Sequence, residues 1–302
     1  MEIDFLVIGA QKAGSTLIHK FLLDHPAVST PDQEIPYFED PNYNPDQIMA
    51  TLLKLFQKAS KNKIKGIKRP DYLARPECPS RIARHLPNAK LIVTIRNPID
   101  RAISAYFHHM RNGFIPIRPL DEGIQNIKNG VYIKRYPRSQ EIIEYGFYHK
   151  HLSRYLEFFS PNQILVTQLV NFKSNPHESV KQLYDFLEVD SSFIPKSLEN
   201  RQNPGVYDLR RLKIISLINR LTYRYHSGMA WRELRPDIIS RIISKSHFML
   251  DAAILSRMTN IRKPPKSKWA EKILEQIYEE DITRLRALLD IEFGIELHGF
   301  PS

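Results

Sequence analysis

The chain has 302 residues, of which 42% are hydrophobic and 25% are charged, and it carries one cysteine, Cys78. This composition is typical of one large globular domain or two small ones, and a single cysteine excludes a disulfide framework within the chain. The formal net charge of +11 predicts an anionic partner, and no apolar run approaches the roughly 18 residues that a membrane-spanning helix needs.

The first predicted elements surround a glycine-containing loop, "GAQKAGST". The apolar residues 5–8 predict a buried parallel strand, and residues 15–24 predict a helix with apolar side chains on one side. Backbone N–H groups in such a turn, with the positive end of the helix dipole, favour a bound anion. The usual nucleoside-triphosphate loop places Lys directly after its second Gly, whereas here Ser15 holds that place and the lysine lies two residues before the Gly. The candidate phosphate-binding residues are Lys12, Ala13, Gly14, Ser15 and Thr16.

The following elements continue the alternation of strands and helices. Strands are predicted at 27–29, 64–67, 90–95 and 164–168, and helices within 45–61 and at 79–85, 100–111, 147–159 and 176–187. This order predicts an α/β fold, a P-loop-type parallel sheet flanked by helices, with ligands beyond the carboxyl ends of the strands. An apolar and basic segment that reads as helices alone follows after residue 206, and a last helix is expected at 269–289.

The division into domains follows from the same pattern. We expect an α/β core at 1–205, a basic helical insertion at 206–268 and a C-terminal helix at 269–302 that returns to the core. The insertion holds 14 Lys and Arg against 4 Asp and Glu, so it carries +10 of the net charge. Three interpretations of it stay open: a solvated helical face, a site for an anionic glycan acceptor, or a face that lies on an anionic membrane.

A second candidate anion site lies in the stretch "IRNPIDRAISAYFHH". Arg96 ends the predicted strand 90–95, and Ser104 lies on the helix that follows. An arginine can hold a phosphate with two parallel hydrogen bonds, and a serine hydroxyl can add a third. These two residues are therefore expected to hold a second phosphate.

Together, the two stretches resemble the nucleotide signatures of sulfotransferases that use 3′-phosphoadenosine 5′-phosphosulfate (PAPS). In that family the first loop holds the 5′-phosphosulfate, and a segment of the type Arg-x-Pro-x-x-Arg-x-x-Ser-x-Tyr holds the 3′-phosphate; here Arg96 and Ser104 stand in register with it. The resemblance implies PAPS as co-substrate and no required metal.

Three further stretches resemble the carbohydrate, heparan-sulfate-type branch of that family. "EIPYFED" resembles the segment whose glutamate, here Glu34, is the catalytic base, and "KRPDYL" resembles the segment whose lysine, here Lys68, contacts the donor. "NRQNPGVY" stands in for a last nucleotide-binding loop, with Arg201 toward the nucleotide. The implied catalytic residues are Glu34, Lys12 and Lys68.

The resemblance implies a transfer of the sulfuryl group from PAPS to a hydroxyl or amine of a saccharide or glycolipid acceptor. Glu34 would accept the acceptor's proton during an in-line attack on sulfur. The basic segment makes an anionic acceptor and peripheral contact with an anionic membrane further expectations, and no recognised motif predicts nucleic-acid binding. The early first strand leaves no room for a signal peptide, so a cytoplasmic protein, with or without contact at the membrane, is expected.

Two other classes of function stay open. A nucleoside-triphosphate-dependent kinase could use the same sheet, but it would need a lysine after Gly14 and an aspartate for Mg²⁺ at a strand end, where this chain has Ser15 and Arg96. A non-catalytic nucleotide-binding scaffold could dock through the basic helices. Saturable sulfate transfer would exclude the scaffold.

Overall fold

The structure is a computed structural model that describes residues 3–57, 60, 62–199, 205–226, 231–243, 264–265 and 267–301. The chain divides into two compact units. Unit 1 comprises Met1–Pro98, Phe147–Gln202 and Tyr278–Ser302, and unit 2 comprises Ile99–Gly146 and Asn203–Ile277. The domain boundaries expected from the sequence stay a prediction.

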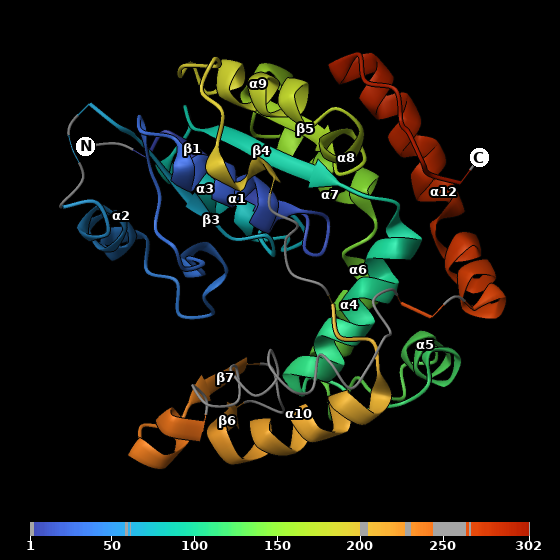
Figure 1. Cartoon of the computed structure of the whole chain (residues 1–302). Helices are drawn as coiled ribbons and strands as arrows, with labels where there is room; N and C mark the ends of the chain where they lie inside the picture. Colours follow the sequence, from blue (N-terminus) through green and yellow to red (C-terminus); the bar gives the residue numbers. More distant parts are fainter. Residues whose placement is uncertain are drawn as a thin grey trace. The chain divides into compact units, whose positions relative to one another are not determined.

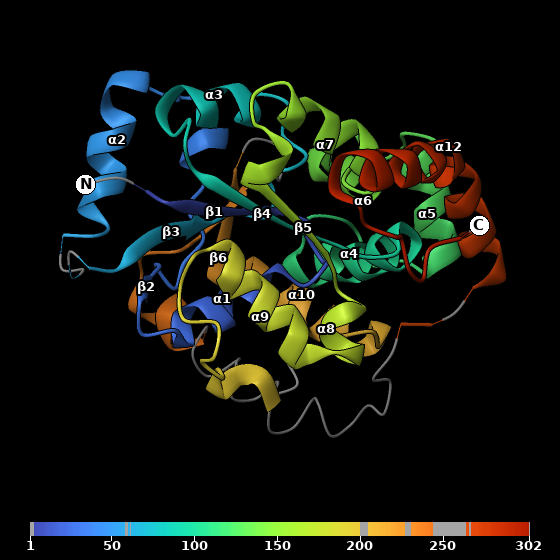
Figure 2. The ribbon, with the colours of Figure 1, turned by 90° about the horizontal axis from the view of Figure 1, so that it is seen from above.

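Unit 1 is built on a sheet of five parallel strands in the order β2-β3-β1-β4-β5. Figure 1 labels β1, β3, β4 and β5, and Figure 2 labels β2 as well. The strands are β1 (Phe5–Gly9), β2 (Val28–Ser29), β3 (Ile64–Lys68), β4 (Lys90–Ile95) and β5 (Ile164–Gln168). The mainly apolar strands β1 and β4 lie inside the sheet, because a strand covered on both faces buries almost every side chain. Every residue of β1 is buried, as are five of the six residues of β4.

Helices cover both faces of this sheet (Figure 2). They are α1 (Ser15–Asp24), α2 (Pro45–Lys54), α3 (Cys78–His85), α7 (Tyr148–Leu156), α8 (Asn171–Ser174) and α9 (Pro176–Phe186), with 3-10 turns η1 (Tyr37–Glu39), η3 (Pro161–Gln163) and η4 (Lys196–Glu199). Helices α1, α8 and α9 lie on one face, and α3 and α7 lie on the other. On the first face Phe21, Ile92 and Leu183 belong to one buried apolar cluster, which fixes α1 and α9 against the sheet.

The predicted α/β class is confirmed, since the sheet is parallel and helices alternate with its strands. The strands predicted at 90–95 and 164–168 and the helix predicted at 15–24 have the observed bounds. A pattern of apolar residues identifies such elements well because each is long enough to show its period.

Unit 2 contains helix α4 (Pro98–Asn112) apart from its first residue, α5 (Leu120–Lys128), η2 (Pro137–Gln140), α6 (Glu141–Glu144), α10 (Leu209–Thr222), β6 (Tyr223–His226) and β7 (Trp231–Leu234). Helix α12 (Lys268–Phe293) begins in unit 2 and continues into unit 1 from Tyr278. In the part of the chain that the structure describes, no helix combines the length and apolarity that a membrane crossing needs.

The expectation of helices alone after residue 206 is wrong. Helix α10 ends at Thr222, and β6 and β7 form an antiparallel pair. The cause is the contacts made by the aromatic residues: the hydroxyl of Tyr225 donates to the carbonyl of Asn112 at 2.8 Å, and Arg232 lies 4.2 Å from the ring centroid of Tyr223. Alternating residues of a strand reach such partners together, whereas a helix would turn them to different sides. Residues 244–263 of the basic segment expected to be helical lie outside the described residues.

A buried ion cluster joins α4 to α6 inside unit 2. The carboxylate of Glu141 accepts two hydrogen bonds from Arg138 Nε, at 3.1 and 2.9 Å, and lies 3.3 Å from His109 Nε2. The Nδ1 atom of His109 lies 2.9 Å from the carbonyl oxygen of Ala105. Both ring nitrogens of His109 therefore lie within hydrogen-bond distance of an oxygen atom. We call Arg138, Glu141 and His109 the unit 2 cluster.

Candidate active site

The described site residues of unit 1 lie at the carboxyl edge of the sheet: Lys68 ends β3, and the others lie in the loops that follow β1, β2 and β4 or in the first turn of α1. This edge is where parallel α/β sheets place their ligands, since all strands end there together. The loop after β1 is tied to β4: the N–H of Ala10 donates to the carbonyl of Thr94 at 2.8 Å, and the hydroxyl of Thr94 donates to the carbonyl of Ala13 at 3.0 Å. Arg96 follows β4 directly and is partly exposed.

The backbone of the loop after β1 suits an anion. Lys12 and Gly14 both have left-handed conformations, with φ of 66° and 108°. A Cβ on Gly14 would come within 2.7 Å of Leu169 Cδ1, so the tight approach requires glycine. Gly14 is also the N-cap of α1, and no side chain among the described residues caps that end. Its first-turn N–H groups and the helix dipole therefore remain available to an anion.

The side chains of this loop differ in their access to solvent. Lys12 is partly exposed and Thr16 is exposed, whereas Ala13 and Ser15 are buried. A ligand in the loop could thus meet the ammonium of Lys12 and the hydroxyl of Thr16. The backbone groups of Ala13 already have partners within the protein, since its N–H donates to the carbonyl of Ala10 at 3.1 Å and its carbonyl accepts from Thr94.

Glu34 and Lys68 are brought together by a backbone contact. The N–H of Ile35 donates to the carbonyl of Lys68 at 3.0 Å, which lays the loop of Glu34 over the end of β3. The buried hydroxyl of Tyr72 holds the same loop, since it donates to the carbonyl of Ile35 and accepts from the N–H of Phe38 at 3.2 Å. Lys68 Nζ consequently lies 3.1 Å from Glu34 Oε1.

Arg69 is a central residue of this site that the sequence patterns did not identify. Its Nη1 donates to Glu34 Oε2 at 2.9 Å, its Nε donates to Glu39 Oε1 at 2.9 Å, and its Nη2 donates to Asp71 Oδ2 at 2.9 Å. Its place beside Lys68 at a strand end was the available signal. We call Glu34, Lys68, Arg69, Glu39 and Asp71 the unit 1 cluster.

The unit 1 cluster continues to the loop after β1. Asp71 Oδ1 accepts a hydrogen bond of 2.9 Å from Nε2 of Gln11, the residue before Lys12. The loop and the carboxylate of Glu34 are thus connected through Asp71 and Arg69 by hydrogen bonds alone. Such a connection fixes the position of one relative to the other.

The electrostatics of the unit 1 cluster are unbalanced, since three carboxylates surround two cations. Burial raises the pKa of Glu39, and the nearby charge of Asp71 adds to the rise against the opposite effect of Arg69. Within the described residues Glu39 Oε2 has no hydrogen-bond partner. Burial and the charge of Lys68 lower the pKa of His19, on α1, to about 4, so this imidazole is neutral at neutral pH.

Glu34 has the most exposed side chain of the unit 1 cluster. Its side chain is 38% exposed, whereas that of Glu39 is 11% exposed and that of Asp71 is 4% exposed. A molecule arriving from solvent can therefore reach the carboxylate of Glu34 while the others stay covered. Its two cationic partners fix that carboxylate in one orientation.

The remaining predicted residues fall elsewhere. Ser104 lies on α4 and is partly exposed within unit 2. Two neighbours in the same motif are buried there: Arg101 donates to the carbonyl of Ile142, and the hydroxyl of Tyr106 donates to the carbonyl of Arg118 at 2.8 Å. Arg201 lies outside the described residues.

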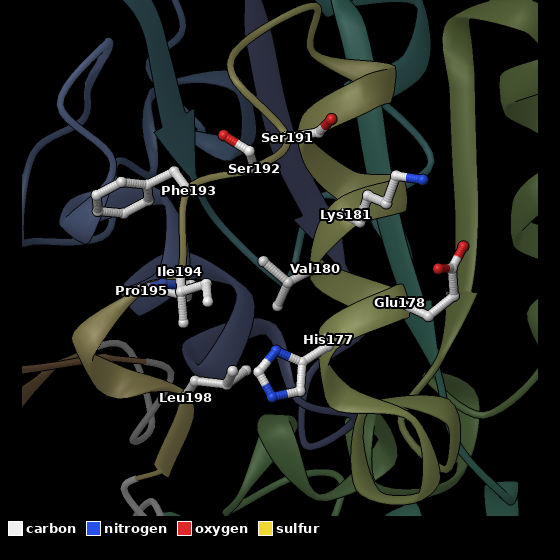
Figure 3. Close-up of a pocket in the computed structure, with 10 residues that line it drawn as sticks. All are labelled: His177, Glu178, Val180, Lys181, Ser191, Ser192, Phe193, Ile194, Pro195 and Leu198. Atoms are coloured by element: carbon white, nitrogen blue, oxygen red, sulfur yellow. The ribbon is translucent and has the colours of Figure 1, made fainter.

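A surface pocket of about 220 Å³ in unit 1 is separate from these residues (Figure 3). It is lined by α9, the loop after it and η4, and His177 and Leu198 point toward each other across it. None of the predicted site residues lines it. Over the described ranges, no group of three His, Cys, Asp or Glu side chains is arranged to hold a metal ion.

Comparison with known proteins identifies the family of the chain. Residues 2–204 match the family described as "Sulfotransferase domain". The human bifunctional heparan sulfate N-deacetylase/N-sulfotransferase 2 is 31% identical over 203 residues, which cover 61% of this chain and 22% of that protein. The mouse heparan sulfate glucosamine 3-O-sulfotransferase 3B1 is 29% identical over 208 residues, 68% of this chain and 51% of that protein. The chain thus spans less than two thirds of the length of either relative.

A solved structure supports the fold. The sulfotransferase of Alicyclobacillus acidocaldarius superimposes with a TM-score of 0.58 at 23% identity, over 72% of this chain and 93% of that one. At this identity the likeness concerns the fold alone.

Proposed function

This chain belongs to the sulfotransferase domain family, and from that premise we propose that it transfers the sulfuryl group of PAPS to a hydroxyl or amine of a saccharide or glycolipid acceptor. The observation that carries the proposal is the placement of Glu34, held by Lys68 and Arg69 at the carboxyl edge of the sheet, beside the loop of Lys12. A carboxylate that is exposed and fixed in orientation suits a general base.

The residues present fit the donor. The uncapped first turn of α1, with Lys12 and the exposed hydroxyl of Thr16, offers several N–H and O–H groups and one positive charge to the 5′-phosphosulfate. Arg96 offers a second cation at the same edge for the 3′-phosphate, and we include Ser104 and Arg201 in that role from the family resemblance. PAPS supplies an activated sulfuryl group whose bond to the 5′-phosphate oxygen breaks during transfer.

The roles of the residues follow from their positions. Glu34 accepts the proton of the attacking hydroxyl or amine, so that a new bond to sulfur forms as the bond to the 5′-phosphate oxygen breaks. Lys12 and Lys68 stabilise the negative charge that develops on the leaving oxygens. Arg69 positions Glu34 when Lys68 turns toward the donor, because its guanidinium keeps one oxygen of that carboxylate hydrogen-bonded.

The class of acceptor is inferred from the relatives. Both mammalian proteins above carry heparan sulfate in their names, so a saccharide, free or lipid-linked, is the acceptor class that we propose. The two names differ in the atom that is sulfated, one N- and the other 3-O-, and so both oxygen and nitrogen acceptors belong in a screen.

Calorimetric titration with adenosine 3′,5′-bisphosphate, the product of the donor, tests the proposal. We expect binding without metal for the wild type, binding weakened at least tenfold for Arg96→Ala, and unchanged binding for Arg84→Ala, a control on an exposed residue of α3. A preference for ATP with Mg²⁺ over the bisphosphate would support a kinase instead. Binding of the bisphosphate without saturable sulfate transfer to any saccharide would support a non-catalytic nucleotide-binding scaffold instead.

A further inference from the structure

Helix α10 has one buried side and an opposite side that exposes apolar residues. Leu212, Ile215, Asn219 and Thr222 are buried in unit 2. On the other side Ile214, Leu217 and Leu221 are 42%, 62% and 57% exposed. Their spacing of three and four residues makes them one stripe along the helix, where a surface helix normally carries polar side chains.

A second group of apolar side chains adjoins the end of this stripe. The chain is helical again over residues 238–243, where Ile238, Ile239 and Ile242 are 73%, 65% and 57% exposed. This stretch begins beside the last turn of α10, since the hydroxyl of Ser240 donates to the carbonyl of Leu221 at 3.4 Å. We call the three residues of the stripe and these three isoleucines the apolar face of unit 2.

Cations surround the apolar face. Lys213 and Arg220 lie four residues before and three residues after Leu217, so they stand beside it on the helix surface, and both are exposed. Over the described residues 205–226 and 231–243 there are 8 Lys and Arg against 3 Asp and Glu. A helix with an apolar stripe and flanking cations is the type that lies in the interface of an anionic membrane.

We propose that the apolar face of unit 2 binds the surface of an anionic lipid bilayer. The leucines and isoleucines would enter the boundary between headgroups and acyl chains, and Lys213 and Arg220 would meet the lipid phosphates. Charge argues against a second copy of the chain as the occupant, because two such basic faces would repel each other. The proposal does not depend on the sulfotransferase chemistry.

Sedimentation of the full chain with lipid vesicles tests this proposal. One set of vesicles contains phosphatidylcholine alone, and the other contains equal parts of phosphatidylcholine and phosphatidylglycerol. We expect binding to the second set, weakened by salt, and little binding to the first. Binding to neither set, or equal binding to both, would overturn the proposal.

Matched variants assign the binding to this face. Leu217→Ser with Leu221→Ser should weaken vesicle binding about tenfold to hundredfold, because two exposed side chains lose their burial in the bilayer. Lys213→Gln with Arg220→Gln should weaken it by about fivefold for each cation removed. Ile194→Ser, at a residue of unit 1 that is 63% exposed, should leave the affinity unchanged.

The same variants distinguish a lipid surface from a protein partner. All four replaced residues are exposed, so the circular dichroism melting curves should coincide with that of the wild type. If Leu217→Ser with Leu221→Ser leaves vesicle affinity intact, the proposal is wrong. If light scattering instead shows a wild-type dimer that this double variant converts to a monomer, the face is a contact between two copies.

Discussion

Each unit of the molecule holds a largely covered glutamate side chain beside an arginine, and the two pairs differ in their surroundings. In unit 1, Glu39 shares Arg69 with two other carboxylates, and burial together with the charge of Asp71 raises its pKa. In unit 2, burial would also raise the pKa of Glu141, but the hydrogen bond from His109 and the charge of Arg138 lower it to about 2. In unit 1 one arginine is shared by three carboxylates, whereas in unit 2 one carboxylate contacts one arginine and one histidine.

This difference distinguishes a candidate active site in unit 1 from a structural ion cluster in unit 2. The unit 1 cluster has more carboxylates than cations, it reaches solvent through Glu34, and it lies where parallel strands end. The unit 2 cluster is closed, and its glutamate side chain is only 8% exposed. An enzyme benefits from a fixed carboxylate that can still accept a proton, whereas a structural ion pair gains from complete satisfaction. Substitutions in the first cluster should therefore change turnover, and substitutions in the second should change stability.

Glu34→Gln should have the largest effect among the substitutions that test this comparison. It removes the proposed base while it keeps the shape of the side chain, so we expect kcat for sulfate transfer to fall about 10²–10⁴-fold with little change in the melting temperature. Rates with labelled PAPS and a saccharide acceptor measure it, beside Glu157→Gln as an exposed control in unit 1. Turnover near the wild-type value would remove Glu34 from the role.

Lys12→Ala should have the next largest effect. Loss of one preorganised cation beside the leaving oxygens should lower kcat by about 10²–10³-fold. Single-turnover rates separate this effect from donor binding, and Lys54→Ala on α2 is an exposed lysine control. An equal change in both lysine variants would contradict a role particular to the loop.

Glu141→Gln tests whether the unit 2 cluster stabilises the fold. The lowered pKa corresponds to about 3 kcal/mol of folding free energy at neutral pH. We expect the free energy of unfolding, measured with urea, to fall by about that amount. A change of less than about 1 kcal/mol in the free energy of unfolding would show that the unit 2 cluster does not stabilise the fold.

The pH dependence of that loss has a defined sign. Because the folded pKa lies below the unfolded value of 4.5, the contribution of Glu141 is complete above pH 4.5 and is lost as the pH falls toward about 2. The difference between the wild type and Glu141→Gln should shrink over the same range. A difference that stays constant from pH 7 to the acid end would mean that ionisation of Glu141 is not its cause.

Arg69→Lys tests whether Arg69 positions Glu34 in unit 1. Lysine keeps the charge but lacks the planar fork that reaches three carboxylates at once. We expect kcat to fall about tenfold to hundredfold through misplacement of Glu34, with the KM for PAPS unchanged. A rise in KM alone would assign Arg69 to donor binding, and Arg84→Lys serves as the surface control.

Glu39→Gln is the smallest expected change and the direct counterpart of Glu141→Gln. A raised pKa means that folding disfavours the ionised form of Glu39, so a neutral amide should alter the free energy of unfolding by less than about 1 kcal/mol. Urea titrations of both variants at neutral pH make the comparison. If both variants lose the same free energy of unfolding, the proposed electrostatic difference between the two clusters is wrong.

The sequence alone determined the α/β class, the sheet strands and several candidate residues. Runs such as "KLIVTI" identify central strands because a strand covered on both faces consists mostly of apolar residues. Arg96 could be proposed as a site residue because parallel strands end at one edge, so a residue at a strand end has a known place, whereas Lys68 was proposed from the family resemblance.

Tertiary structure decided the partners of those residues and the form of the segment after residue 206. Arg69 and Glu34 are 35 residues apart, and their contact depends on the hydrogen bond from Ile35 to Lys68, which no local pattern encodes. Likewise, β6 and β7 replace a predicted helix because Tyr225 and Arg232 find acceptors at the end of α4. Periodicity reflects which face of an element is buried, whereas the pairing of charges depends on how distant loops are brought together.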